Sequence, residues 1–277
     1  MNRGNDLPGV HFLLSLIDPQ DAAAVRRRLG IGRPEQYPAD RAARELARLD
    51  APRSALLWML ERDDPATNQL VFHHVGVADA VKRDILRGVP FGAAAGSLPV
   101  PTRCSVRFCS HEEPKIQISE RGVIGGLREA RTMGSARMAV EAVSRRDWSD
   151  VAEADRAEPL PGYVRWALTV RIDCPPEVRA QFGSHPKFTH RLRTAGIVEL
   201  REYVERGRRP QNVLGLFQFG APLFPHRVAE AAALLTPLVR TEIGANPDAW
   251  AVLAQLLPTF SGTVPELVST SGAIASA

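Results

Sequence analysis

Hydrophobic residues in this chain recur at helical spacing, three or four positions apart. Val228, Ala232, Leu235 and Val239 form one such stripe. A stripe with this period lies along one face of an α-helix and needs a neighbouring element to cover it. The periodic segments are short, about 8–12 residues each, and numerous. The pattern therefore predicts an all-α fold in which many short helices pack together.

Helix starts and ends are marked by characteristic residues. An Asp or Asn followed by proline stands at Asp18-Pro19, Asp64-Pro65 and Asn246-Pro247. The Asx side chain can accept hydrogen bonds from the first turn, and proline at the first helical position removes an N–H that lacks a partner there. We expect helices over 20–29, 66–73 and 248–257. Glycines that favour a left-handed end to a helix are Gly30, Gly88, Gly183, Gly196 and Gly244.

A triplet of proline, any residue and an apolar residue recurs with a period of about 36 residues. The triplets begin at Pro114, Pro186, Pro222 and Pro258. Their flanks agree in part, since Gln181-Phe182-Gly183 matches Gln218-Phe219-Gly220. The skipped position between Pro114 and Pro186 holds Asp150, so that unit lacks the proline. A fixed period of this length is typical of helical repeats that stack in a row.

One unit of this repeat extends from 175 to 208. Helices are expected over 176–182, 187–195 and 198–206, and each is too short to bury its apolar stripe alone. The organisation resembles the HEAT and armadillo class of helical repeats over about 65–260, at the level of architecture only. The resemblance implies an α-solenoid-like stack and assigns no functional residue. In such a stack the rings buried between units are Phe182, Phe188, Phe219 and Phe224.

The segment 102–119 is compatible with two structures. Polar and apolar residues alternate over 103–108, as in a small β-hairpin, whereas the phase of the repeat predicts the end of one helix and the start of the next. The run 89–101 before it is rich in Pro, Gly and Ala, which is typical of a flexible connection. We expect an N-terminal helical lobe at 1–88, the connection at 89–101 and a helical repeat array at 102–277, or else one continuous solenoid.

Composition favours an ordinary globular protein. The chain has 277 residues, of which 44% are hydrophobic and 24% charged. No apolar run reaches the roughly 18 residues that span a bilayer, so we expect no membrane partner. The net charge is +4, but 32 of the 35 basic residues are arginine, which is typical of a GC-rich genome. A basic balance of this origin is a weak argument for nucleic-acid binding. The sequence does not predict the oligomeric state.

The three cysteines are too few for a disulfide framework and odd in number, which favours a reducing, cytoplasmic location. Cys104, Cys109 and His111 form the most metal-like group, because thiolates and imidazoles bind zinc. The candidates for a fourth ligand are His73, His74 and Cys174. The close cysteine pairing of zinc sites is absent, and Cys109 takes the place that Gly183 holds in another unit. We therefore expect structural cysteines and no bound metal.

No catalytic or cofactor-binding motif is present. The chain lacks Gly-x-Gly-x-x-Gly, a Gly-Lys-Ser/Thr loop, Gly-x-Ser-x-Gly and His-Glu-x-x-His. A catalytic triad assembles in space rather than in sequence, so an enzyme with a dispersed active site stays a third alternative. Without a positive signal, we expect a protein that is not an enzyme and carries no cofactor.

The segment 179–209 contains eight basic residues against three acidic ones. Its candidate binding-surface residues are Arg191, Arg201, Arg208 and Arg209. Helical spacing scatters these arginines, and Glu202 and Glu205 are close enough in sequence to pair with some of them. The preferred interpretation is a scaffold that binds a protein or peptide along its stacked helices. The alternative is a helical-repeat protein that binds nucleic acid through this segment.

Overall fold

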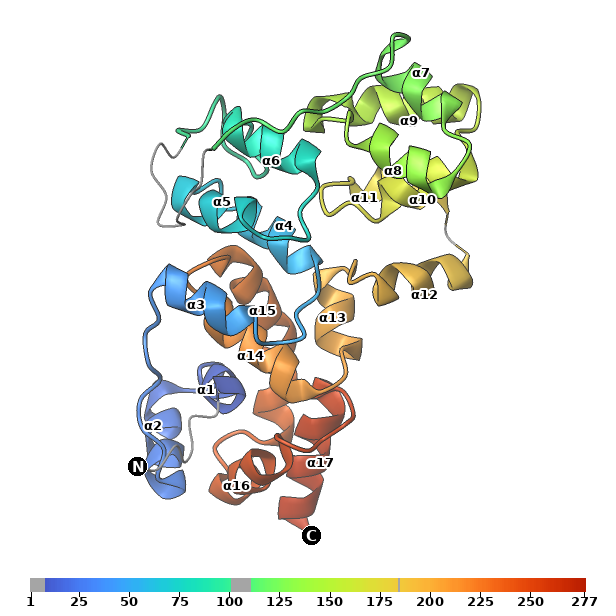
Figure 1. Cartoon of the computed structure of the whole chain (residues 1–277). Helices are drawn as coiled ribbons and strands as arrows, with labels where there is room; N and C mark the ends of the chain where they lie inside the picture. The colour runs from blue at the N-terminus through green and yellow to red at the C-terminus, as the bar shows by residue number, and fades with distance from the viewer. Residues whose placement is uncertain (1–7, 101–110, 184) are drawn as a thin grey trace. The chain divides into compact units, whose positions relative to one another are not determined.

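The computed structural model describes residues 8–100, 111–183 and 185–277, and these residues form an all-α protein (Figure 1). Within these ranges no strand forms, and an isolated bridge joins Arg208 to Thr263. The predicted all-α class is confirmed, as are the many short helices packed together. The first half of the segment 102–119, up to residue 110, lies outside the described residues, and its second half from 111 onward forms neither helix nor strand.

The chain divides into two compact units, of which the first contains both ends of the sequence. Unit 1 comprises 1–51 and 198–277, and unit 2 comprises 52–197. The helices of unit 1 are α1 (Pro8–Leu14), α2 (Pro19–Leu29), α3 (Ala39–Leu46), α13 (Leu200–Arg206), α14 (Pro210–Gly220), α15 (Pro225–Glu242), α16 (Pro247–Leu256) and α17 (Val264–Ser276). Those of unit 2 are α4 (Ser54–Leu60), α5 (Pro65–Phe72), α6 (Asp79–Leu86), α7 (Gly122–Glu129), α8 (Met133–Val140), α9 (Trp148–Ala157) with a preceding 3-10 turn (Arg145–Asp147), α10 (Gly162–Thr169), α11 (Pro176–Phe182) and α12 (Pro186–Thr194).

The three Asx-Pro helix starts are confirmed. Asp18 accepts hydrogen bonds from the backbone N–H groups of Gln20 and Asp21 at the start of α2. Asp64 caps α5 and Asn246 caps α16 in the same way, each with proline at the first helical position. A cap of this kind stabilises a helix by about 1 kcal/mol, because it supplies acceptors to donors that have none within the helix.

Four of the five glycines expected at helix ends have left-handed backbone. Gly30 ends α2 with a φ of 66°, and Gly88, Gly196 and Gly244 are also in the positive-φ region. Gly183, in contrast, follows α11 with a φ of 165°, which is extended backbone open to any residue. The expectation of a left-handed end was therefore wrong for Gly183, because the chain turns away from α11 there without an αL residue.

Helix α14 is the centre of unit 1. Its residues Val213, Leu214, Leu216 and Phe217 are fully buried, so the helix is apolar around most of its circumference. It packs against α1, α3, α15 and α17. A Cβ placed on Gly9 of α1 would lie 2.9 Å from the Cβ of Leu214, so this close helix contact depends on glycine. Helices from the two ends of the sequence thus share one core.

Unit 2 has a second core, formed by α7 to α11. Leu127, Val151, Val164 and Leu168 are fully buried in it, together with the ring of Trp148. The buried charged groups of unit 2 lie partly within helices, as Arg83 and Asp84 of α6 and Asp155 of α9, and partly between α10 and α11, as Arg171 and Asp173. Each buried aspartate and arginine side chain of unit 2 makes at least one hydrogen bond, as buried charges require, although the Nε of Arg83 has no acceptor among the described residues.

A buried ion pair joins the end of α8 to the segment before α11. Arg171 donates to the Asp173 carboxylate through Nε (2.9 Å) and Nη2 (2.6 Å). Its Nη1 donates to the carbonyl oxygens of Val140 (2.6 Å) and Val143 (2.7 Å), at the C-terminal end of α8. The guanidinium lies over the Trp148 ring, 5.1 Å from its centroid. One arginine therefore ties together three segments of the unit.

The expected division of the chain differs from these units. Residues 89–100 of the expected connection lie within unit 2, so the boundary between these two units is elsewhere. The Asp63 carboxylate accepts hydrogen bonds from the backbone N–H groups of Phe91, Gly92 and Ala94, which fixes part of this run to the end of α4. The Pro- and Gly-rich composition therefore marks an anchored loop.

The 36-residue repeat is not confirmed. Pro186 is the first residue of α12, whereas Pro222 lies in the turn between α14 and α15, and Pro258 follows α16. Three of the four rings expected between repeat units are nevertheless buried, namely Phe182, Phe219 and Phe224. Phe188 is half-buried. The packing of α1 on α14 also departs from a linear stack, in which each repeat contacts only its neighbours.

Candidate functional site

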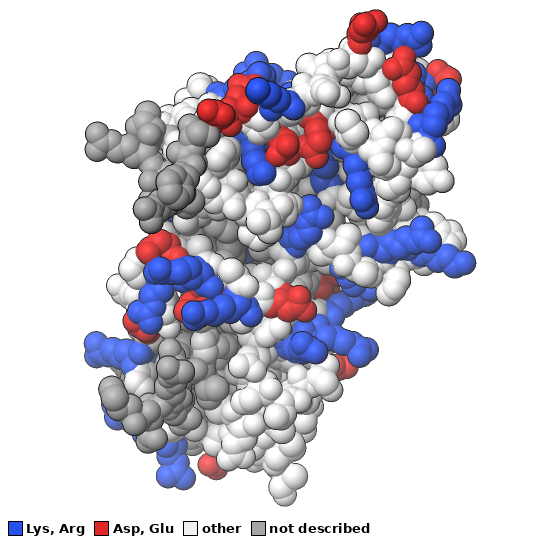
Figure 2. Space-filling model, viewed as in Figure 1, with Lys and Arg blue, Asp and Glu red and all other residues white. Residues whose placement is uncertain are grey.

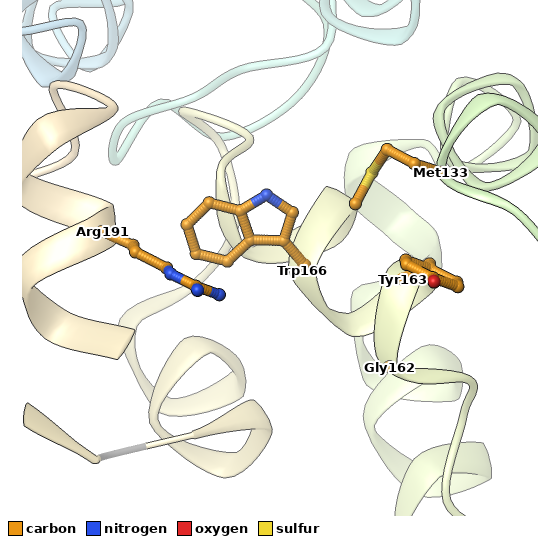
Figure 3. A pocket seen from close by; sticks show the side chains of 5 residues that line it. All are labelled: Met133, Gly162, Tyr163, Trp166 and Arg191. Carbon is orange, nitrogen blue, oxygen red and sulfur yellow. The ribbon is translucent and has the colours of Figure 1, made fainter. Parts of the chain in front are cut away.

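An open pocket in unit 2 combines aromatic and apolar side chains with an arginine. It has a volume of about 370 Å³ and is lined by Met133, Gly162, Tyr163, Trp166 and Arg191. Figure 3 shows the Trp166 ring between the Arg191 side chain on one side and Met133 and Tyr163 on the other. The five residues come from three helices, α8, α10 and α12.

Helix α10 supplies the aromatic floor of the pocket. It starts after Pro161, and its buried residues Val164, Ala167 and Leu168 hold it against the core of unit 2. Tyr163 and Trp166 are three residues apart, so they project from a common side of the helix. Tyr163 is 53% exposed and Trp166 is half-buried, so both rings are open to a ligand.

Helix α12 supplies the charge. The His185 side chain caps it by accepting a hydrogen bond from the backbone N–H of Lys187 through Nδ1 (3.2 Å). Phe188 and Arg191 are three residues apart on this helix, and the Phe188 ring meets the Trp166 ring edge-on at 5.6 Å. This aromatic contact holds the Arg191 side of α12 beside α10. Figure 2 shows basic side chains and no acidic ones over α12 on the face in view.

The pocket has the chemistry of a recognition site. A half-buried tryptophan beside an exposed tyrosine gives a flat apolar surface at a small entropic cost, and Met133 adds an adaptable apolar wall. Arg191 makes no ion pair with any residue that the structure describes, so its guanidinium is available to a carboxylate or phosphate. The lining contains neither an acidic residue nor a nucleophile paired with a base.

Only one of the four arginines predicted as a binding surface lines this pocket. Arg191 belongs to unit 2, and Arg201, Arg208 and Arg209 belong to unit 1. Arg201 forms an ion pair with Glu205 (3.0 Å), which is the kind of self-pairing that the spacing predicted. Arg209 precedes α14 in left-handed backbone, with a φ of 61°. The basic segment is therefore divided between the two units.

The metal-like group lies partly outside the described residues, because these do not include Cys104 and Cys109. His111 is described, and its ring centroid lies 6.1 Å from that of His73. Burial and the neighbouring His111 both lower the pKa of His73. Cys174 is buried in unit 2, where burial raises the pKa of its thiol to about 12. It is therefore an unreactive core residue.

The aromatic members of the pocket were missed in the sequence. Tyr163 and Trp166 form a Tyr-x-x-Trp pattern just after Pro161-Gly162. The three-residue spacing predicts a shared helix face, but an aromatic pair on one face is more often part of a core. Only the placement of α12 leaves these rings beside open space, and that placement depends on packing between segments distant in sequence.

The chain was compared with known protein families, with curated proteins and with solved structures, and none of them matches it. In the described part of the chain, no helix combines the length and the apolar character needed to cross a membrane.

Proposed function

We propose that this protein is a non-catalytic helical scaffold that binds a peptide segment of a partner protein at the pocket of α8, α10 and α12. The observation that carries the proposal is the pair formed by the exposed Tyr163 and the half-buried Trp166, beside an arginine that has no ion-pair partner among the described residues. Exposed aromatic residues and arginine are the residues most enriched at the energetic centres of protein interfaces.

The lining also indicates the chemistry of the bound segment. An apolar or aromatic side chain of the partner would pack on Trp166 and against Met133. A carboxylate within a few residues of it would bind Arg191 through paired hydrogen bonds, which match the planar geometry of the guanidinium. The expected ligand is thus a short segment with an apolar anchor next to Asp or Glu.

Nucleic acid is the alternative, since bases also stack on tryptophan and tyrosine. Binding along a strand needs a row of cationic groups that follow successive phosphates. Among the described residues that line this pocket, Arg191 is the one basic residue. Arg179 donates to the backbone carbonyls of Thr169 and Arg171, so its charge serves the fold of unit 2. These contacts favour a peptide.

The wider proposal concerns architecture and location. Packed short helices that present a recognition surface are how HEAT- and armadillo-like proteins act, and we propose that this chain belongs to that type of scaffold. The buried, unreactive Cys174 thiol agrees with a reducing cytoplasmic compartment.

The proposal is tested by selecting peptides from a random display library on the full-length protein. The selected peptides are then measured by fluorescence anisotropy against Trp166→Ala, Arg191→Glu and the control Arg193→Glu. Arg193 is on the same helix and undergoes the same charge change, but two residues of helix rotate its side chain away from that of Arg191. Trp166→Ala tests the apolar anchor, and Arg191→Glu tests the carboxylate contact.

We expect the selected peptides to share an apolar residue beside an acidic one. Their affinity should fall at least about tenfold in Trp166→Ala and Arg191→Glu, because each variant removes a central contact. In Arg193→Glu, the affinity should stay within about threefold of the wild-type value. Peptides that bind all four proteins equally well, or a library that yields no binder, would contradict the proposal.

A further inference from the structure

Unit 1 contains a second pocket that is unrelated to the peptide site. It has a volume of about 360 Å³ and lies among α1, α2, α14 and α15, with an apolar wall made of Phe12, Phe217 and Val228. Phe12 and Phe217 are buried, and their ring centroids lie 5.5 Å apart. Figure 1 shows these four helices in the part of the chain that forms unit 1. The volume is at the lower end of the range for small-molecule sites, about 300–1,000 Å³.

Arg26 of α2 gives this pocket a specific polar feature. Its Nε is shielded from water, and within the described residues this N–H has no hydrogen-bond acceptor. A buried donor without an acceptor is unfavourable, because it has lost its hydrogen bonds to water and gained none in return. Because Arg26 lines the pocket, a small turn of its side chain would bring this N–H to an oxygen atom of a bound ligand, which would supply the missing acceptor.

The charge of the lining is one-sided. Arg26 is its cationic residue, His11 and Gln218 are polar, and none of the described residues that line it is acidic. The helix α15 faces the pocket with Val228 and the small residues Ala229 and Ala232, which leaves room for an apolar body. An apolar wall with an arginine at its edge complements a molecule that has a hydrocarbon part and a negative end.

We propose that this pocket binds a small amphiphilic monocarboxylate, with its hydrocarbon body against Phe12, Phe217 and Val228 and its carboxylate on Arg26. The site is independent of the peptide pocket, which lies in the other unit. With the Arg26 side chain turned toward it, the carboxylate would accept a charge-assisted hydrogen bond from the guanidinium, and this bond distinguishes an acid from a neutral analogue of the same length.

Isothermal titration calorimetry of the full-length protein with decanoate and with decanol tests the site. Decanoate should bind with a submillimolar Kd, and decanol should bind at least about tenfold more weakly, since it lacks the charge-assisted bond. Arg26→Gln should reduce decanoate binding to the level of decanol. Arg27→Gln is the matched control, because Arg27 is the next residue of α2, is exposed and does not line the pocket.

A second pair of variants tests the apolar wall. Ala229→Trp places an indole in the pocket and should abolish binding of both probes, whereas Ala233→Trp, at an exposed position of α15 outside the lining, should not. Ala229 and Ala233 are both exposed, so both variants are expected to fold. Equal affinity for decanoate and decanol, unchanged binding of decanoate to Arg26→Gln, or no binding of decanoate to the wild-type protein would overturn the proposal.

Discussion

Replacement of Asp173 by asparagine should strongly destabilise unit 2. The Asp173 carboxylate accepts hydrogen bonds from Nε and Nη2 of Arg171 and from Nε1 of Trp148 (3.3 Å). Both charged side chains are almost completely shielded from solvent, with 3% and 0% exposure. Asparagine removes the negative charge and one acceptor oxygen, so the guanidinium stays buried without a counter-ion. Breaking one partner of a buried pair costs about 3–5 kcal/mol.

Movement of the Arg171 side chain should not restore the stability that Asp173→Asn loses. Its Nη1 is bonded to the carbonyl oxygens of Val140 and Val143, and its guanidinium is packed on the Trp148 ring. Turning the side chain toward solvent would leave these two carbonyls unsatisfied. Whether the Arg171 side chain stays buried or turns toward solvent, buried polar groups are left without partners, which costs about 1–3 kcal/mol per group.

Urea unfolding followed by tryptophan fluorescence measures this effect, because three of the four tryptophans, Trp58, Trp148 and Trp166, lie in unit 2. The control is Glu153→Gln, on the exposed side of α9, which should change the free energy of unfolding by no more than about 0.5 kcal/mol. A loss below about 1 kcal/mol in Asp173→Asn would refute the reasoning, since the carboxylate would then contribute no more than an exposed pair.

Three further predictions concern stability and metal content. Burial raises the pKa of Asp84 above its ordinary value of 3.8, so the folded protein favours the neutral acid. The wild type should therefore lose stability relative to Asp84→Asn as the pH rises from below 3.8 through the raised pKa. Urea midpoints that differ by a constant amount between about pH 3 and pH 7 would contradict this. Phe182→Ala should lower the free energy of unfolding in urea by about 3–5 kcal/mol, because the ring is only 7% exposed in the core of unit 2. A decrease under about 1 kcal/mol would show that the ring is dispensable. Elemental analysis of the purified protein should find no stoichiometric zinc or iron, and one metal per chain that is lost in Cys104→Ser/Cys109→Ser would reverse that expectation.

Helix boundaries were predictable because their signals are local. Asp18 and Asn246 bond to N–H groups two and three residues away, so the sequence around each start contains the whole interaction. The helix expected over 176–182 is found as α11 with the same bounds, and those expected over 187–195 and 198–206 are found as α12 and α13 with shifts of one or two residues. The spacing of prolines alone does not establish a repeat, because proline is favourable both in the first turn of a helix and just after the end of one.

The arrangement of the helices was not predictable, because it depends on contacts between distant segments. Gly9 is read in sequence as a weak helix residue, and only the approach of α14 shows why glycine is required there. The Arg171–Asp173 pair likewise resembles any exposed pair until the carbonyls of Val140 and Val143 are placed beside it. Trp166 could equally have been buried, so the pocket could not be inferred from the chain alone.

The central claim is that the pocket around Trp166 binds a peptide rather than a nucleic acid. The most direct test titrates a selected peptide, a DNA duplex and a single-stranded oligonucleotide with the protein, at low and at physiological salt. We predict peptide binding that weakens only slightly with salt and is lost in Trp166→Ala, because the main contact is apolar. Micromolar or tighter oligonucleotide binding that persists at physiological salt, and is lost when Arg191, Arg201, Arg208 and Arg209 are neutralised together, would contradict the account.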